Sequence, residues 1–195
     1  MKRFLFMVVC CLALIPYAKA QDENYRFDAG VFADYFRLGA TGTNMWGLGG
    51  RAGIELVPHI GFEGEVAFDF NRAFTDAFEN DFGGTSYVTS GVRGLHALFG
   101  PRFSVDHGPI RPFAEVKFGF DSFTFNNLPV GLTSVSNPIQ NLRNQTLNAA
   151  LLLGGGLEAK VVGPVGVRLD VGDELYFNHG AEHGLRATFG PVVRF

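Results

Sequence analysis

Two short sets of residues have types and spacings that suggest chemistry, and each lacks part of what that chemistry needs. His179, Glu182 and His183 offer two imidazoles and a carboxylate, which are common zinc ligands. They fall in a predicted loop, which is weak support for a coordination site, so we expect no metal. Residues 47–52 match the glycine pattern of dinucleotide-binding turns by letter, but the strand-like residues 54–56 follow where that motif needs a helix.

A hydrolytic site is not expected either. Serine catalysis needs a histidine base beside the serine, and the chain has neither a Gly-x-Ser-x-Gly nor a His-x-Ser sequence. His96 lies inside a predicted strand, where we expect charged neighbours. We therefore expect no catalytic residues, no cofactor and no enzymatic activity.

The net charge, the cysteine positions and the first 20 residues limit the classes of function and the location that the chain can have. The 195 residues include 16 Lys and Arg against 19 Asp and Glu, a net charge of −3, so no nucleic-acid partner is expected. Residues 1–20 have the charged start, apolar run and small-residue end of a secretory signal peptide, which predicts export. Residues 21–195 then form one domain. Both cysteines, Cys10 and Cys11, fall in the leader, so we expect no disulfide.

The mature chain alternates apolar and polar residues with a period of two, as strands with two different faces do. Phe62, Val66 and Phe68, for example, oppose Glu63 and Glu65. The pattern predicts eight strands, over residues 25–37, 45–57, 61–72, 91–105, 110–123, 146–161, 164–176 and 184–195. Strands of this length cross a bilayer core when they are tilted.

The connections alternate in length along the chain. Tight turns are predicted at 58–60, 106–109 and 163–164, and longer polar loops at 73–90 and 124–145. Short connections at one end and long ones at the other are typical of outer-membrane barrels. A soluble barrel would also alternate, with its charged face in water.

Three features favour the membrane form, in which the polar face lines the lumen. Glycines are frequent on the polar face, aromatic residues gather near both strand ends, and the last strand ends on Phe195. We therefore predict an all-β fold, an eight-stranded antiparallel up-and-down transmembrane β-barrel with short periplasmic turns and longer extracellular loops.

The lumen of such a barrel is narrow enough for side chains to fill it, which argues against a wide channel. Charged residues from most of the strands share the lumen face, and we expect them to pair because an unpaired interior charge is costly. The predicted network consists of Arg51, Glu63, Glu65, Arg102, Glu115, Lys117, Glu158, Lys160, Arg168, Asp170 and Arg186. Further acids on this face are Asp28, Asp34, Asp69, Asp121 and Glu174. A narrow ion pathway is the alternative to a closed plug.

Most of the second half of the chain carries a family resemblance. The segments are LFGPR (98–102), RPFAEV (111–116), LGGGLE (153–158), VRLD (167–170) and GPVVRF (190–195). Together they resemble the small outer-membrane β-barrel proteins of the porin family type, which include OmpA transmembrane domains and OmpX. The resemblance implies a bacterial outer-membrane location with both termini periplasmic, and contact with outer-membrane lipids and lipopolysaccharide. It also implies that Phe195 is the signal read by the barrel-assembly machinery.

The sequence leaves the biochemical role open between three classes. We expect first a structural or interaction role in the cell envelope, with the amide-rich loop at 124–145 as the segment that would meet an unknown ligand. A narrow passive channel for ions or small solutes is the alternative. A lipid-modifying outer-membrane enzyme is the third and weakest.

Overall fold

A computed structural model describes residues 26–39, 42–79, 85–105, 108–126, 133–134, 147–177 and 180–195. The predicted leader, residues 1–20, lies outside them. The strands are β1 (Phe27–Leu38), β2 (Thr43–Val57), β3 (Ile60–Asp69), β4 (Arg72–Glu79), β5 (Thr85–Ser104), β6 (Ile110–Asn126), β7 (Thr133–Ser134), β8 (Asn148–Val162), β9 (Val165–Phe177) and β10 (Ala181–Arg194). None of the described residues belongs to a helix with the length and apolar character that a membrane crossing requires.

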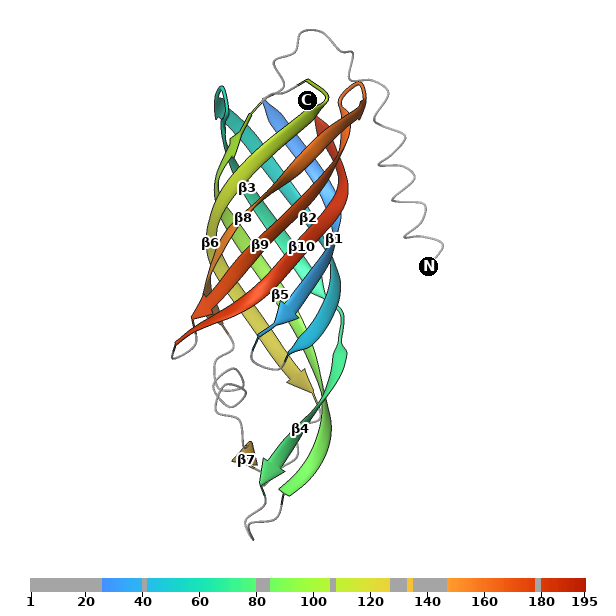
Figure 1. The fold of residues 1–195 in the computed structure, drawn as a ribbon, viewed down its shortest axis with the longest axis vertical. Helices are drawn as coiled ribbons and strands as arrows, with labels where there is room; N and C mark the ends of the chain where they lie inside the picture. Colours follow the sequence, from blue (N-terminus) through green and yellow to red (C-terminus); the bar gives the residue numbers. More distant parts are fainter. Residues whose placement is uncertain are drawn as a thin grey trace.

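Eight of the described strands close into an antiparallel barrel (Figure 1). In the barrel, β1 pairs with β2 and β10, β2 with β3, β3 with β5, β5 with β6, β6 with β8, β8 with β9, and β9 with β10. Strands β4 and β7 lie outside this ring: β4 pairs with the first part of β5, and β7 pairs with β4. The predicted eight-stranded barrel is thereby confirmed. The tight turns contain residues with positive φ, namely His59 (73°), Gly108 (65°) and Gly163 (53°).

Phe27, at the start of β1, and Phe195, which follows β10, meet at the β1–β10 seam. The Phe27 amide donates to the Phe195 carbonyl at 3.0 Å, and the Phe195 amide donates to the Phe27 carbonyl at 2.9 Å. Their rings stack with centroids 6.1 Å apart. The last residue thus continues the ladder that closes the barrel.

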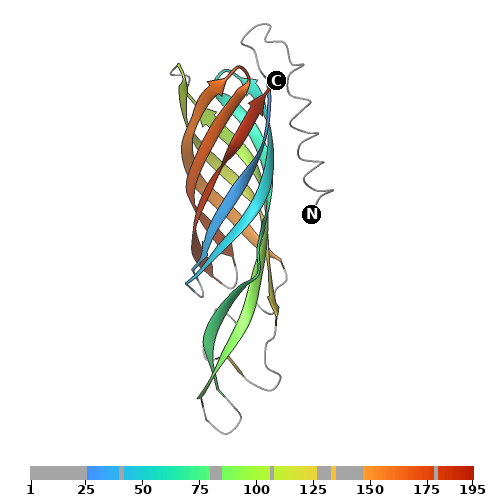
Figure 2. The ribbon, with the colours of Figure 1, turned by 90° about the vertical axis from the view of Figure 1, so that its right-hand side faces the viewer.

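The prediction of a long polar loop at 73–90 is wrong for the residues of this range that the structure describes, 73–79 and 85–90. These residues contain β4 and the first part of β5, which pair from Arg72↔Val92 to Glu79↔Thr85 and project beyond the barrel as a hairpin (Figure 2). The pairing partners include aromatic and β-branched residues, which favour strands even where the stretch as a whole is polar. Strand β7, from the second predicted loop, pairs with the tip of β4.

The two faces of the strands are divided as the sequence predicted. Val66 is 54% exposed and Phe68 is 44% exposed on the outside, whereas Glu65 and Asp69 of the same strand are buried in the lumen. The large exposed side chains around the barrel are overwhelmingly apolar, which is the reverse of a soluble protein. The exterior is therefore suited to lipid.

An arginine on the outer face tests this reading. Val66 lies in the middle of β3, whereas Val57 is the last residue of β2 beside a turn. We expect Val66→Arg to reduce the free energy of folding into lipid vesicles by about 2–4 kcal/mol, and the matched Val57→Arg by about 0–1 kcal/mol. Equal effects in urea titrations would contradict a lipid-facing band.

Candidate functional site: the charged lumen

The lumen is lined by ionisable side chains, among which the acids outnumber the bases in the described part of the chain. Among the described residues, the buried carboxylates are Asp28, Asp34, Glu63, Glu65, Asp69, Glu115, Asp121, Glu158, Asp170 and Glu174. The buried arginines and lysine are Arg51, Arg102, Lys117, Arg168 and Arg186. Each strand places these residues inward at every second position, so that side chains from distant parts of the sequence meet inside.

A central group of the network is centred on Lys117 of β6. Its Nζ lies 2.8 Å from Glu63 Oε1, 2.6 Å from Glu65 Oε2 and 3.0 Å from Glu115 Oε2. Arg168 of β9 reaches the same acids, with Nη1 at 2.5 Å from Glu63 Oε2 and Nη2 at 2.8 Å from Glu115 Oε2. Strands β3, β6 and β9 are thus joined across the lumen by charge pairs.

Two further arginines extend this group in different directions. Arg102 Nη2 donates to Asp28 Oδ2 at 2.5 Å, and its Nη1 donates to Glu63. Arg51 donates to Asp170 at 2.6 Å and lies 4.3 Å above the ring centroid of Phe32. Both guanidinium groups therefore have ionic partners, and Arg51 also has an aromatic one, which offset the cost of removing them from water.

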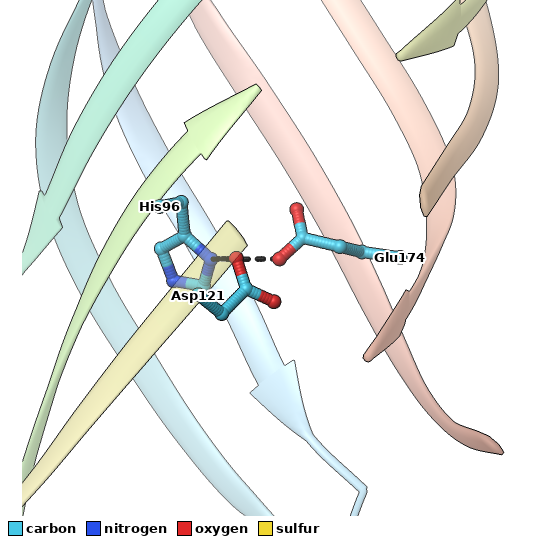
Figure 3. Close-up of side chains that lie close together, drawn as sticks. All are labelled: His96, Asp121 and Glu174. Atoms are coloured by element: carbon cyan, nitrogen blue, oxygen red, sulfur yellow. Dashed lines mark hydrogen bonds and ion pairs between the residues drawn. The ribbon is translucent and has the colours of Figure 1, made fainter. Parts of the chain in front are cut away.

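A second group surrounds His96 of β5, between the central network and the loop end of the barrel. His96 Nδ1 lies 2.7 Å from Glu174 Oε1 and 3.0 Å from Asp121 Oδ1 (Figure 3), and Nε2 lies 3.1 Å from Asp69 Oδ2. Arg186 joins the two groups, because its Nη1 is 2.9 Å from both Glu174 and Glu65.

Small and apolar residues hold the His96 group in place. A Cβ atom at Gly94 would lie 3.0 Å from His96 Nε2, so glycine leaves the imidazole its space. The Phe36 and Phe123 rings lie 4.7 and 5.9 Å from the imidazole, measured between centroids. They belong to an apolar cluster of fully or almost fully buried residues, Phe36, Leu38, Met45, Val92, Phe123 and Tyr176, which covers the histidine.

The structure places the predicted network residues inside the barrel with one exception. Lys160 is exposed at the short-turn mouth, beside a cavity of about 310 Å³ that Arg111 and Glu158 also line. Lys160 lies on the inward-facing side of β8, but it is only two residues from the end of that strand and does not reach the central network. Glu158 instead pairs with Arg194, at 2.7 Å between Oε1 and Nε.

His96 has the charged neighbours that the sequence predicted, because it lies on the same inward face of β5 as Arg102. Which acids it contacts was not predicted, since that depends on the strand register. Of the loop residues considered as a metal site, the structure describes Glu182 and His183. His183 pairs with Asp173 at 2.7 Å on the exposed surface, and His179 lies outside the described residues.

The centre of the lumen has little free space. A void beside Glu65, Glu115, Asp170 and Arg186 measures about 10 Å³. That volume is about the minimum that one water molecule needs. The charged side chains, rather than solvent, therefore fill this part of the barrel.

Comparison with known proteins identifies the fold through structure alone. No family model and no curated protein matches the sequence. The structure of Neisserial surface protein A has a TM-score of 0.53 at 14% identity, covering 87% of this chain and 97% of that one. The chain therefore has the fold of an outer-membrane β-barrel. Ail of Yersinia pestis, solved with the heparin analogue sucrose octasulfate, has a TM-score of 0.51 at 15% identity, again covering 87% and 97%. The outer membrane protein OprG of Pseudomonas aeruginosa has a TM-score of 0.51 at 10% identity, covering 88% and 96%.

Removing the central cation tests the network. We expect Lys117→Met to lower the free energy of unfolding in detergent by about 3–5 kcal/mol, because three carboxylates lose their shared partner in a dry interior. The control, Lys160→Met at the exposed mouth, should change it by less than about 0.5 kcal/mol. Indistinguishable unfolding curves for the two variants would show that Lys117 is not part of a coupled network.

Proposed function

We propose that the protein is a bacterial outer-membrane barrel with a structural or interaction role, and that its lumen is a closed plug. The observation that carries this is the set of buried charge pairs across the centre, where the void is only about 10 Å³. A wide solvated pathway would need these side chains to separate from their partners. The proposal includes no catalytic step.

The part that meets partners is proposed to be the end opposite the tight turns. The β4–β5 hairpin projects there, and β7 pairs with it (Figures 1 and 2). Connections on a rigid barrel are free to vary, which suits them to binding. The apolar exterior is proposed to contact outer-membrane lipids, with lipopolysaccharide around the hairpin end.

Conductance of the refolded protein in planar bilayers tests the closed lumen. We expect no steady conductance steps from protein whose folding is shown by heat-dependent gel mobility. The control is a charge-balanced variant with Glu63, Glu115, Lys117 and Arg168 all changed to serine, which should open the centre and conduct. Reproducible steps from the unmodified protein would favour the narrow channel instead.

Deleting Phe195 tests the proposed recognition by barrel-assembly machinery. The residue contributes two backbone hydrogen bonds and a stacked ring to the seam, so its loss weakens closure as well as the proposed signal. We expect a lower yield in the outer membrane with unchanged export across the inner membrane. The matched Phe195→Tyr variant keeps the ring and the backbone and should restore the yield. Equal yields for the deletion and the full chain would remove this proposal.

A further inference from the structure

We propose that His96, Asp121 and Glu174 bind a divalent transition-metal cation inside the barrel. The three residues come from β5, β6 and β9, and one ligand atom of each lies within 4.8 Å of the others (Figure 3). An imidazole and two carboxylates are a donor set used by Zn²⁺ and its neighbours in the first transition series. This inference goes beyond the proposed scaffold role and does not depend on it.

Nδ1 of His96 has two carboxylate neighbours but can donate only one proton. Nδ1 lies within hydrogen-bond distance of both Asp121 and Glu174, at 3.0 and 2.7 Å, but it carries at most one proton. A single N–H is then shared between two carboxylates, which repel each other when both are ionised. A cation bound to Nδ1 and to both carboxylates satisfies all three groups together.

The other ring nitrogen has the partner that a metal-bound histidine requires. Nε2 lies 3.1 Å from Asp69 Oδ2, so an Nε2–H donates to this carboxylate and leaves the Nδ1 lone pair directed at Asp121 and Glu174. Metal-ligating histidines almost always donate their second N–H in this way, which fixes the tautomer and the ring orientation. Arg186 similarly holds the outer oxygen of Glu174, with Nη1 at 2.9 Å from Oε2.

The local charge balance favours a doubly charged ion. Four carboxylates, those of Asp34, Asp69, Asp121 and Glu174, surround His96 and Arg186, and Arg186 is also shared with Glu65. When all four carboxylates are ionised, this buried group keeps an excess of negative charge even with the histidine protonated. Leaving such charge unneutralised is costly, and a divalent cation removes the excess.

One of the proposed ligands has a carboxylate oxygen without a hydrogen-bond partner. Among the described residues, the buried side-chain atoms without a hydrogen-bond partner include Asp69 Oδ1, Asp121 Oδ2, and both amide atoms of Asn148. Asn148 is paired with Asp121 in the β6–β8 ladder and is 1% exposed. Buried polar groups without partners are rare, and Asp121 Oδ2 belongs to one of the proposed ligands. Asp69 Oδ1 lies on the other side of the imidazole, toward Gly47.

The site fits a small cation after a modest adjustment. A tetrahedral zinc ion with bonds of about 2.0–2.2 Å needs ligand atoms about 3.4 Å apart. Asp121 and Glu174 would therefore move away from Nδ1 by roughly half an ångström. The apolar cluster over His96 restricts entry from the loop end, so the ion is best offered while the barrel folds.

Refolding in the presence of metal tests the proposal. The mature protein is refolded into detergent with Zn²⁺, freed of unbound metal by gel filtration, and analysed for zinc by mass spectrometry. We expect about one retained zinc per chain, a higher midpoint of urea unfolding with zinc than with a chelator, and no retention of Mg²⁺, because an imidazole site favours the softer cation.

Isosteric variants locate the ion. Asp121→Asn and Glu174→Gln each remove one charged ligand with little change in shape, and both should lose the retained zinc and the zinc-dependent shift while keeping the gel mobility of folded barrels. Asp69→Asn should weaken zinc binding by about 10-fold or more, because it removes the group that orients His96. The control His183→Asn removes an exposed histidine that is also paired with a carboxylate, and zinc retention should not change.

Two results would overturn the proposal. The first is a folded protein that retains no zinc and whose unfolding midpoint is the same with zinc and with chelator. The second is retention that survives Asp121→Asn and Glu174→Gln but falls in His183→Asn, which would place the ion on the surface. Neither result bears on the conductance test, so this inference and the closed lumen fail separately.

Discussion

A closed ring of eight strands leaves an interior too narrow for bulk water, and this constraint determines how the rest of the molecule is organised. Every second residue of each strand points into that interior. A charged residue placed there needs an opposite charge from another strand. Lys117 of β6 and Arg168 of β9 both meet Glu63 of β3 in this way, so that ion pairs take the place of a hydrophobic core.

The outside of the barrel follows from the same alternation. With the polar residues used inside, the apolar residues of each strand are left on the surface, as Val66 and Phe68 show beside Glu65. The protein is in this sense inverted, and lipid is the medium in which the inversion is stable. Within the lumen, the central group is well supplied with cations, whereas the group around His96 is rich in acids. The excess of acids is why we propose a cation site around His96, whereas the paired central group closes the lumen.

Much of the fold could be predicted from the sequence because a period of two is a local signal. The eight barrel strands and the inward face of Glu63, Glu115 and Lys117 required only that signal. The β4–β5 hairpin was not recognised, since its residues are mostly polar and strand pairing decides their structure. The ion-pair partner of each charged residue also could not be predicted from the sequence, because it depends on strand register and barrel closure. His96 meets Asp69, Asp121 and Glu174 only once β3, β5, β6 and β9 are in place.

The central claim is that oppositely charged lumen residues stabilise the barrel through one another. A double-mutant cycle with Arg168→Met and Glu63→Gln, followed by equilibrium unfolding in detergent, measures that coupling directly. Arg168 Nη1 lies 2.5 Å from Glu63 Oε2, so a favourable coupling of about 0.5–3 kcal/mol is predicted. Additive effects of the two substitutions would contradict the claim and leave the lumen charges as independent residues that merely fill space.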